Sequence, residues 1–194
     1  MRKLIIGISG ASGAVYGIRA LQVLKDISGI ETHLVLSPSA KRTIIEETDW
    51  DVPSVEALAD VVHSHRDIGA PIASGSFQTI GMLVAPCSIK SLSGIAHCYS
   101  DNLLARAADV CLKERRRLVL LVRETPLHLG HIELLAQAAR CGAVLLPPMP
   151  AFYHRPQTVD DIVNHTVGKA LDQFEIPHRL FERWKDTAGD AAGG

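Results

Sequence analysis

The residues from Lys3 to Gly13 read Lys-Leu-Ile-Ile-Gly-Ile-Ser-Gly-Ala-Ser-Gly, so an apolar run changes abruptly into small residues. The segment that follows, residues 14–30, carries apolar residues with helical periodicity. This order predicts a buried strand, a tight turn and a helix. The turn offers backbone N–H groups and the hydroxyls of Ser9 and Ser12 at a helix N-terminus, where anions bind favourably. We interpret it as a candidate site for a phosphorylated small molecule. The alternative is a tight connection that binds no ligand.

The spacing of the glycines argues against the common nucleotide-binding fingerprints. The glycines of the turn are three residues apart, which is not the Gly-x-Gly-x-x-Gly pattern of dinucleotide sites. The second apolar run, residues 32–36, ends in Ser37-Pro38-Ser39, and not in the acidic residue that binds a ribose. No Gly-Lys-Ser/Thr follows the turn, so a nucleoside-triphosphatase loop is excluded. Hydroxyls at the end of the second strand suit another phosphate or a polar ring edge.

Short apolar runs alternate along the whole chain with segments of helical periodicity. We predict strands at 3–9, 32–37, 82–86, 117–122 and 144–147, and helices at 13–25, 39–47, 55–61, 89–96, 102–115, 131–141 and 159–174. Continuous apolar strands are typical of a parallel sheet with helices on both faces. The 194 residues suffice for one domain. The predicted fold is therefore α/β, a three-layer doubly wound parallel sheet (Rossmann/flavodoxin-like), in a single domain over residues 1–185 with a flexible tail at 186–194.

Composition argues against several classes of function. The net charge is −1 and the basic residues form no long stripe, so no nucleic-acid partner is expected. No secretion signal and no apolar stretch of about 20 residues is present, so we expect a cytoplasmic protein without a membrane span. The histidines of His-Leu-Gly-His are three residues apart, which is not the usual helical metal spacing, and no metal is expected. The cysteines form no C-x-x-C pair and are predicted to be small buried residues: Cys87, Cys98, Cys111 and Cys141.

Every predicted strand is followed by residues that can bind a ligand. Hydroxyls follow the first three strands, Arg123 and Glu124 follow the fourth, and a proline-rich segment with Tyr153 follows the fifth. Because the carboxyl ends of parallel strands meet at one edge of a sheet, we expect these groups to converge. Arg123 and Glu124 are either a surface ion pair or an anion-binding guanidinium beside an acid/base carboxylate, and their position favours the second. Lys113 and Arg106, seven residues apart on one helical face, are either a solvated stripe or part of the site.

Together these residues resemble the UbiX family of flavin prenyltransferases. The likeness extends over nearly the whole chain, up to about Trp184. The matching segments are Gly-Ile-Ser-Gly-Ala-Ser-Gly-Ala at 7–14, Glu-Thr-Asp at 47–49, Ser-Gly-Ser-Phe at 74–77, Pro-Cys-Ser-Ile-Lys-Ser at 86–91, Arg-Ala-Ala-Asp-Val at 106–110, Leu-Lys-Glu-Arg-Arg at 112–116, Val-Arg-Glu-Thr-Pro at 122–126 and Pro-Ala-Phe-Tyr-His-Arg-Pro at 150–156.

The resemblance implies an enzyme that joins a dimethylallyl group from dimethylallyl phosphate to N5 and C6 of reduced FMN and releases phosphate without a metal. The product, prenylated FMN, would serve a UbiD-type decarboxylase in ubiquinone biosynthesis or aromatic-acid decarboxylation. The resemblance also implies a homo-oligomer, typically a dodecamer, with active sites at subunit contacts. Two alternatives remain open: an FMN carrier that feeds a partner, and a flavin-dependent decarboxylase of the same fold that acts on a cysteine-containing substrate.

The resemblance also implies a role for individual residues. FMN would be bound by Gly10, Ala11, Ser12, Ser37, Ser88, Ile89, Lys90, Ser91 and Arg123. Dimethylallyl phosphate would be bound by Arg106, Lys113, Tyr153, Lys169 and Trp184. The catalytic residues would be Glu47 and Glu124 as acid/base carboxylates, with Ser12 and Lys113. Many relatives have arginine where this chain has Lys169. Because lysine keeps the charge but loses the bidentate fork, we expect phosphate binding with altered affinity.

Overall fold

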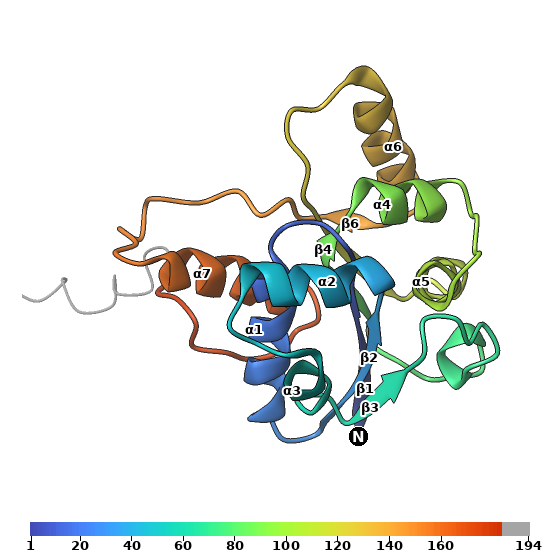
Figure 1. Cartoon of the computed structure of the whole chain (residues 1–194), viewed down its shortest axis with the longest axis horizontal. Helices are drawn as coiled ribbons and strands as arrows, with labels where there is room; N and C mark the ends of the chain where they lie inside the picture. The colour runs from blue at the N-terminus through green and yellow to red at the C-terminus, as the bar shows by residue number, and fades with distance from the viewer. Residues whose placement is uncertain (184–194) are drawn as a thin grey trace, which may run out of the picture.

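The computed structural model describes residues 1–183 and has one parallel sheet at its centre (Figure 1). The sheet has six strands in the order β3-β2-β1-β4-β5-β6, and every neighbouring pair is parallel. The strands are β1 (Arg2–Ile8), β2 (Ile30–Leu36), β3 (Val61–His63), β4 (Gly81–Cys87), β5 (Arg117–Val122) and β6 (Val144–Leu145). The strand order reverses between β1 and β4, which is the switch point at which doubly wound sheets bind ligands. The predicted fold class is confirmed.

Helices cover both faces of this sheet (Figure 1). They are α1 (Ala14–Lys25), α2 (Pro38–Glu47), α3 (Val52–Glu56), α4 (Ile89–Ala96), α5 (Leu103–Lys113), α6 (Leu129–Arg140) and α7 (Val159–Asp172), with a short 3-10 turn η1 (Pro71–Ala73). Two separate buried clusters follow from this arrangement. One lies between the sheet and α1, α2, α3 and α7, and the other between the sheet and α4, α5, α6 and η1. Within residues 1–183, no helix combines the length and apolarity that a membrane span requires.

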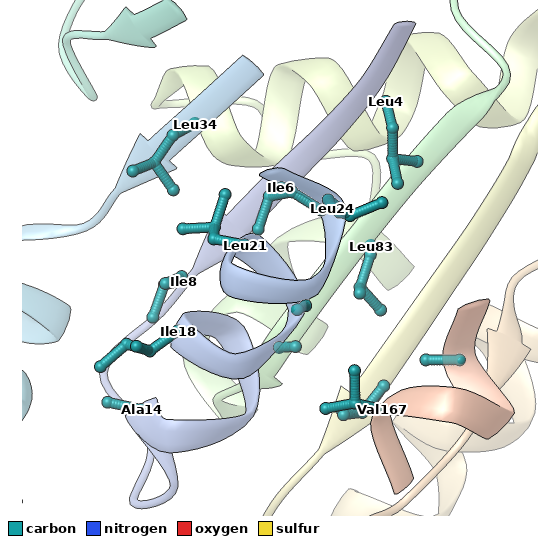
Figure 2. Packing of buried hydrophobic residues seen from close by; sticks show 14 of the residues in the cluster. Leu4, Ile6, Ile8, Ala14, Ile18, Leu21, Leu24, Leu34, Leu83 and Val167 are labelled. Carbon is teal, nitrogen blue, oxygen red and sulfur yellow. The ribbon is translucent and has the colours of Figure 1, made fainter. Parts of the chain in front are cut away.

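The strands are continuously apolar because both of their faces are buried. Leu4 and Ile6 of β1 belong to the cluster under α1, whereas Ile5 between them belongs to the opposite cluster. Figure 2 shows Leu21 of α1 directed toward this face of the sheet. The helix lies close to β4 at Gly17, where an added Cβ would come within 2.3 Å of the Ala85 carbonyl oxygen. This packing fixes the position of α1 on the sheet, with its N-terminus at the carboxyl end of β1.

We expect the Leu21→Ala variant to be destabilised by about 2–5 kcal/mol, because Leu21 is fully buried and its removal leaves a cavity between α1 and the sheet. Urea unfolding followed by circular dichroism measures the change. The matched control is Ile45→Ala on α2, whose side chain is 65% exposed and should change stability by less than about 0.5 kcal/mol. Equal effects at the two positions would contradict the packing described above.

The region after α2 differs from the prediction. The predicted helix at 55–61 is wrong, because α3 begins at Val52, where the Asp51 side chain accepts a hydrogen bond from the Ser54 N–H at 2.7 Å, and ends at Glu56. Val61 instead begins β3, a sixth strand that was not predicted. β3 has three residues and lies at the sheet edge, so it is too short to show a strand pattern in the sequence.

Smaller differences occur at element ends. The helix predicted at 102–115 stops at Lys113, and Arg115 has a left-handed φ of 55°. The last strand is only Val144–Leu145. Cys98 and Cys141 are exposed, not buried as predicted, because each directly follows the last residues of a helix; Cys87 and Cys111 are buried as expected. Trp184 and the predicted tail at 186–194 lie outside the described residues.

Candidate functional site

A cavity of about 800 Å³ opens at the carboxyl ends of β1, β2 and β4. Five of the residues predicted to bind a ligand line it together: Gly10, Ser37, Ser88, Lys90 and Ser91. They come from three of the five strand ends that were expected to converge. Arg123, Glu124 and Tyr153, which follow the other two predicted strands, are not among the residues that line the cavity. The cavity therefore lies at the switch point of the sheet, between the turn after β1 and the first turns of the helices that follow β2 and β4.

Three helix N-termini point their positive ends toward this cavity. Ser37 caps α2 by accepting a hydrogen bond from the Ala40 N–H at 3.0 Å, and Ser88 caps α4 by accepting one from the Ser91 N–H at 3.3 Å. Asn102 caps α5, and it also lines the cavity. Helix N-termini carry a partial positive charge and undonated N–H groups, so they favour a bound anion. With the Lys90 ammonium among the lining groups, the cavity is chemically suited to a phosphate.

Ser9 does not offer its hydroxyl to a ligand, contrary to the expectation. The side chain is 1% exposed, donates to the Pro86 carbonyl oxygen at 2.9 Å and accepts from the Ser88 N–H at 2.8 Å. Ser9 thus links the turn after β1 to the turn after β4 by two hydrogen bonds. These bonds fix the relative positions of two walls of the cavity. Ser12 is exposed at the same turn, and Ala11 is buried behind it.

Glu47, Ser12 and Arg123 lie around the N-terminus of α1. The Glu47 Oε2 accepts a hydrogen bond from the Gly13 N–H at 2.7 Å. Arg123 follows β5, and its backbone N–H donates to the Cys87 carbonyl oxygen at 3.1 Å. Burial raises the pKa of Tyr16 in the first turn of α1, and the positive charge of Arg123 opposes that shift. A carboxylate and a cation therefore flank the turn that was predicted to bind an anion.

Glu124 lies next to Arg123 at the end of β5. Its Oε1 accepts a hydrogen bond from the Thr125 N–H at 3.0 Å, and the side chain is exposed. No ion pair joins Glu124 to Arg123 in the part of the chain that the structure describes. The surface ion pair considered as the alternative is therefore absent there, and the carboxylate stays accessible.

The structure does not bring Arg106 and Lys113 to this cavity within one chain. Arg106 on α5 pairs with Asp109 at 2.9 Å and donates to the Ala73 carbonyl oxygen at 3.2 Å. Lys113 pairs with the adjacent Glu114 at the last residue of α5, just before β5 begins. Because β5 begins at the amino edge of the sheet, Lys113 lies at the edge opposite the cavity.

Tyr153 and Lys169 form a separate group at α7. The Tyr153 hydroxyl is 2.8 Å from His165 Nε2, and Lys169 is exposed one helical turn after His165. Neither residue lines the cavity. The described residues predicted for the prenyl substrate thus lie on α5 and near α7, outside the lining of the cavity: Arg106, Lys113, Tyr153 and Lys169. Ile89, the first residue of α4, is half-buried beside the cavity.

Ser39, whose hydroxyl was expected at the end of the second strand, also lines the cavity. Several other polar lining residues were not predicted: His65, Ser93, His97, Tyr99, Asp101 and Asn102. His65 follows β3, so the missed strand concealed it. The others lie in α4 and in the connection between α4 and α5. Asn102 before an apolar helical run was a recognisable cap signal in the sequence. The His128 and His131 rings lie 3.6 Å apart between centroids with an interplanar angle of 34°. Residues 1–183 contain no group of three potential metal ligands.

We expect the free energy of unfolding to fall as the pH is lowered from about 7.5 to 5. Burial is the largest influence and lowers the pKa of His65 and of His63; for His65 it outweighs the opposing charge of Asp101, and Lys90 and Arg66 lower the pKa further. The unfolded chain takes up protons near pH 6.5 that the folded chain binds only at lower pH, so stability is present above pH 6.5 and lost below it. Urea unfolding at a series of pH values measures this slope. It should be shallower in His65→Asn, and an identical slope would show that His65 does not contribute.

The sequence matches the family model described as Flavoprotein over residues 1–171. It is 64% identical to "Flavin prenyltransferase UbiX" of Escherichia coli K12 over 187 residues, which are 95% of this chain and 99% of that protein. The chain belongs to the UbiX family of flavin prenyltransferases. The flavin prenyltransferase UbiX of Thauera aromatica is 60% identical and covers 94% of this chain and 93% of its own length.

Solved structures of the family have the same fold. The structure of AnUbiX (PadA1) in complex with FMN and dimethylallyl pyrophosphate superposes with a TM-score of 0.93 at 46% identity, covering 95% of this chain and 97% of that one. A dodecameric FMN-dependent UbiX-like decarboxylase from Escherichia coli O157:H7 has a TM-score of 0.92 at 51% identity, over 94% and 99% of the two chains. The recognition made from the sequence motifs is confirmed.

Proposed function

We propose that this protein is a flavin prenyltransferase that transfers a dimethylallyl group to reduced FMN and releases phosphate. The observation that carries the proposal is the cavity at the switch point, which three helix N-termini and Lys90 surround in a chain 46% identical to a protein solved with FMN and dimethylallyl pyrophosphate. The same arrangement fits a phosphate group of FMN. The proposed FMN-binding residues are Gly10, Ala11, Ser12, Ser37, Ser88, Ile89, Lys90, Ser91 and Arg123.

The chemistry needs stabilisation of a leaving phosphate. The allylic C–O bond breaks and its electron pair leaves with the phosphate, which cations and hydrogen-bond donors can stabilise without a metal. Arg106, Lys113, Lys169 and the Tyr153 hydroxyl are the proposed groups at that phosphate. The prenyl carbon that loses phosphate forms a bond to N5, and the far carbon of the prenyl double bond forms a bond to C6, so that N5 and C6 each lose a proton. One of these two protons is taken up by the other carbon of the former double bond, and one by the leaving phosphate. Glu124 and Glu47 are the proposed groups that give a proton to the phosphate and accept one from the flavin.

In one chain these groups lie at three separate places, so we propose that an oligomer assembles the site. Exposed apolar side chains support this reading, because several lie at the start of α6 or on the segment that carries Tyr153 and leads into α7: Leu127, Leu129, Ile132, Met149, Phe152 and Val159. Neighbouring copies would bring Arg106 and Lys113, and Tyr153 and Lys169, to the FMN cavity. A dodecamer is the proposed assembly, as in the relative from Escherichia coli O157:H7. Trp184, outside the described residues, would help to wall the prenyl pocket.

The proposed context follows from the product. Prenylated FMN is useful only to an enzyme that takes it up, so we propose a UbiD-type decarboxylase as its recipient and the cytoplasm as its place of synthesis. The same cavity also suits an FMN carrier, which would hold the flavin without changing it. It equally suits a decarboxylase of the same fold, which would need a cysteine-containing substrate.

An anaerobic assay with reduced FMN and dimethylallyl phosphate separates these functions. We expect phosphate release together with a flavin product whose mass has increased by the prenyl group. A carrier would retain flavin and release no phosphate. A decarboxylase would instead release carbon dioxide from a peptide with a C-terminal cysteine. Parallel reactions with dimethylallyl diphosphate identify the preferred donor, since only the leaving group differs.

A further inference from the structure

A hydrogen bond joins the Tyr153 hydroxyl to an imidazole that the proposed chemistry does not use. The phenol oxygen is 2.8 Å from His165 Nε2. Tyr153 belongs to the proline-rich segment before α7, and His165 belongs to α7. Tyr153 is 46% exposed and so reaches the surface, whereas His165 is only 8% exposed. The histidine therefore lies behind the tyrosine, where it can orient the phenol without contacting a substrate itself.

Two other aromatic rings pack against the ring of His165. His154 stacks on it with ring centroids 4.6 Å apart and an interplanar angle of 7°. The Phe181 ring lies 4.7 Å away on a segment that returns over α7. That segment approaches so closely that a Cβ on Gly168 would come within 2.5 Å of Phe181. The imidazole consequently has little room to turn, and the direction of its hydrogen bond to Tyr153 is fixed.

His165 is a neutral imidazole near pH 7. Burial lowers its pKa, and the neighbouring His154 and Lys169 lower it further. A neutral imidazole has one donor nitrogen and one acceptor nitrogen, whereas a phosphate oxygen carrying negative charge only accepts. When the Tyr153 hydroxyl donates to a phosphate, its oxygen can accept from His165 Nε2–H. The hydrogen bond is thus compatible with phosphate binding only when His165 Nε2–H donates and the Tyr153 oxygen accepts.

We propose that His165 is a positioning residue, which donates from Nε2 to the Tyr153 oxygen and so directs the phenolic proton at the phosphate of the prenyl donor. This inference rests on the proposed function, because it needs Tyr153 to contact that phosphate. Lys169 follows His165 by one turn on the same helix, so the two residues share a helix with a fixed spacing. Histidine and lysine would then act on one phosphate, the first through Tyr153 and the second directly.

A double-mutant cycle between His165 and Tyr153 tests the proposal on the intact oligomer. In His165→Phe the ring volume remains but the hydrogen bond is lost, and we expect the KM for dimethylallyl phosphate to rise about tenfold with little change in FMN affinity. Tyr153→Phe should have at least this effect. If His165 acts through the phenol, adding His165→Phe to Tyr153→Phe changes nothing further. Additive losses, or an unchanged KM in His165→Phe, would overturn the proposal.

A pair of amide variants separates positioning from folding. The amide nitrogen of His165→Gln can reach the place of Nε2 and donate, so this variant should recover most of the KM. His165→Asn is too short to reach Tyr153 and should resemble His165→Phe, with which it is interchangeable in the cycle if the phenylalanine variant does not fold. Equal defects in the glutamine and asparagine variants would refute the assignment.

Phosphate release by the wild-type protein tests the proposed function separately from the role of His165. Absence of phosphate release by the wild type, with FMN still bound, would refute prenyl transfer. Equilibrium titration with dimethylallyl phosphate then decides about His165. Weaker binding in His165→Asn than in His165→Gln would still support positioning at a phosphate site. Equal binding, or none by the wild type, would reject it.

Discussion

We expect the Glu124→Gln variant to release phosphate about 100- to 10,000-fold more slowly than the wild type while it still binds FMN, because positioned general acids contribute rate factors of this size. Glutamine retains the shape of the side chain and the acceptor oxygen that now bonds to the Thr125 N–H at 3.0 Å. It cannot transfer a proton to a leaving phosphate. The change therefore removes the chemistry of the carboxyl group and leaves the turn after β5 in place.

Single-turnover measurement of phosphate release, under anaerobic conditions and at saturating FMN, gives this rate without interference from product release. The matched control is Glu133→Gln, an exposed carboxylate on α6 outside the proposed site. It should retain the wild-type rate. If Glu124→Gln also turned over at the wild-type rate, Glu124 would not be the acid, and Glu47 would become the remaining candidate.

The sheet could be predicted from the sequence because its strands are buried on both faces and flanked by long helices. β1, β4 and β5 read as continuous apolar runs, and their parallel order follows from the helices between them. β3 could not be predicted in this way. It has three residues at the sheet edge, and its hydrogen bonds to β2, not its composition, define it. The same limit hid His65, which follows β3 into the cavity.

The site was predictable as far as it depends on backbone turns at strand ends. Ser37, Ser88 and Asn102 are helix caps, and a cap shows in the sequence as a hydroxyl or amide before a helical run. The positions of Lys113 and Tyr153 have no comparable signal. Neither residue lines the cavity of its own chain. Subunit packing would determine which ligand they contact, and a single sequence does not encode that packing as a local pattern.

Gly10 is the position where the smallest change should cost the most ligand affinity. A Cβ added there would lie 2.2 Å from the Ser39 Cβ and 3.2 Å from the Ser39 carbonyl carbon. The turn after β1 therefore passes against the first turn of α2, and both form the wall of the cavity. In Gly10→Ala the turn must move away from α2. The backbone N–H groups that would donate to the flavin and its phosphate are then displaced from the ligand.

We expect Gly10→Ala to bind FMN at least about 100-fold more weakly, equivalent to roughly 2.7 kcal/mol, with a small change in melting temperature because the turn lies outside both buried clusters. Fluorescence titration of FMN gives the dissociation constant. Gly69→Ala is the matched control, since its Cβ would meet only the Asp67 Oδ1 at an ordinary 3.4 Å. Unchanged FMN affinity in Gly10→Ala would mean that the flavin does not bind against this turn, and the cavity at the switch point would lose its proposed ligand.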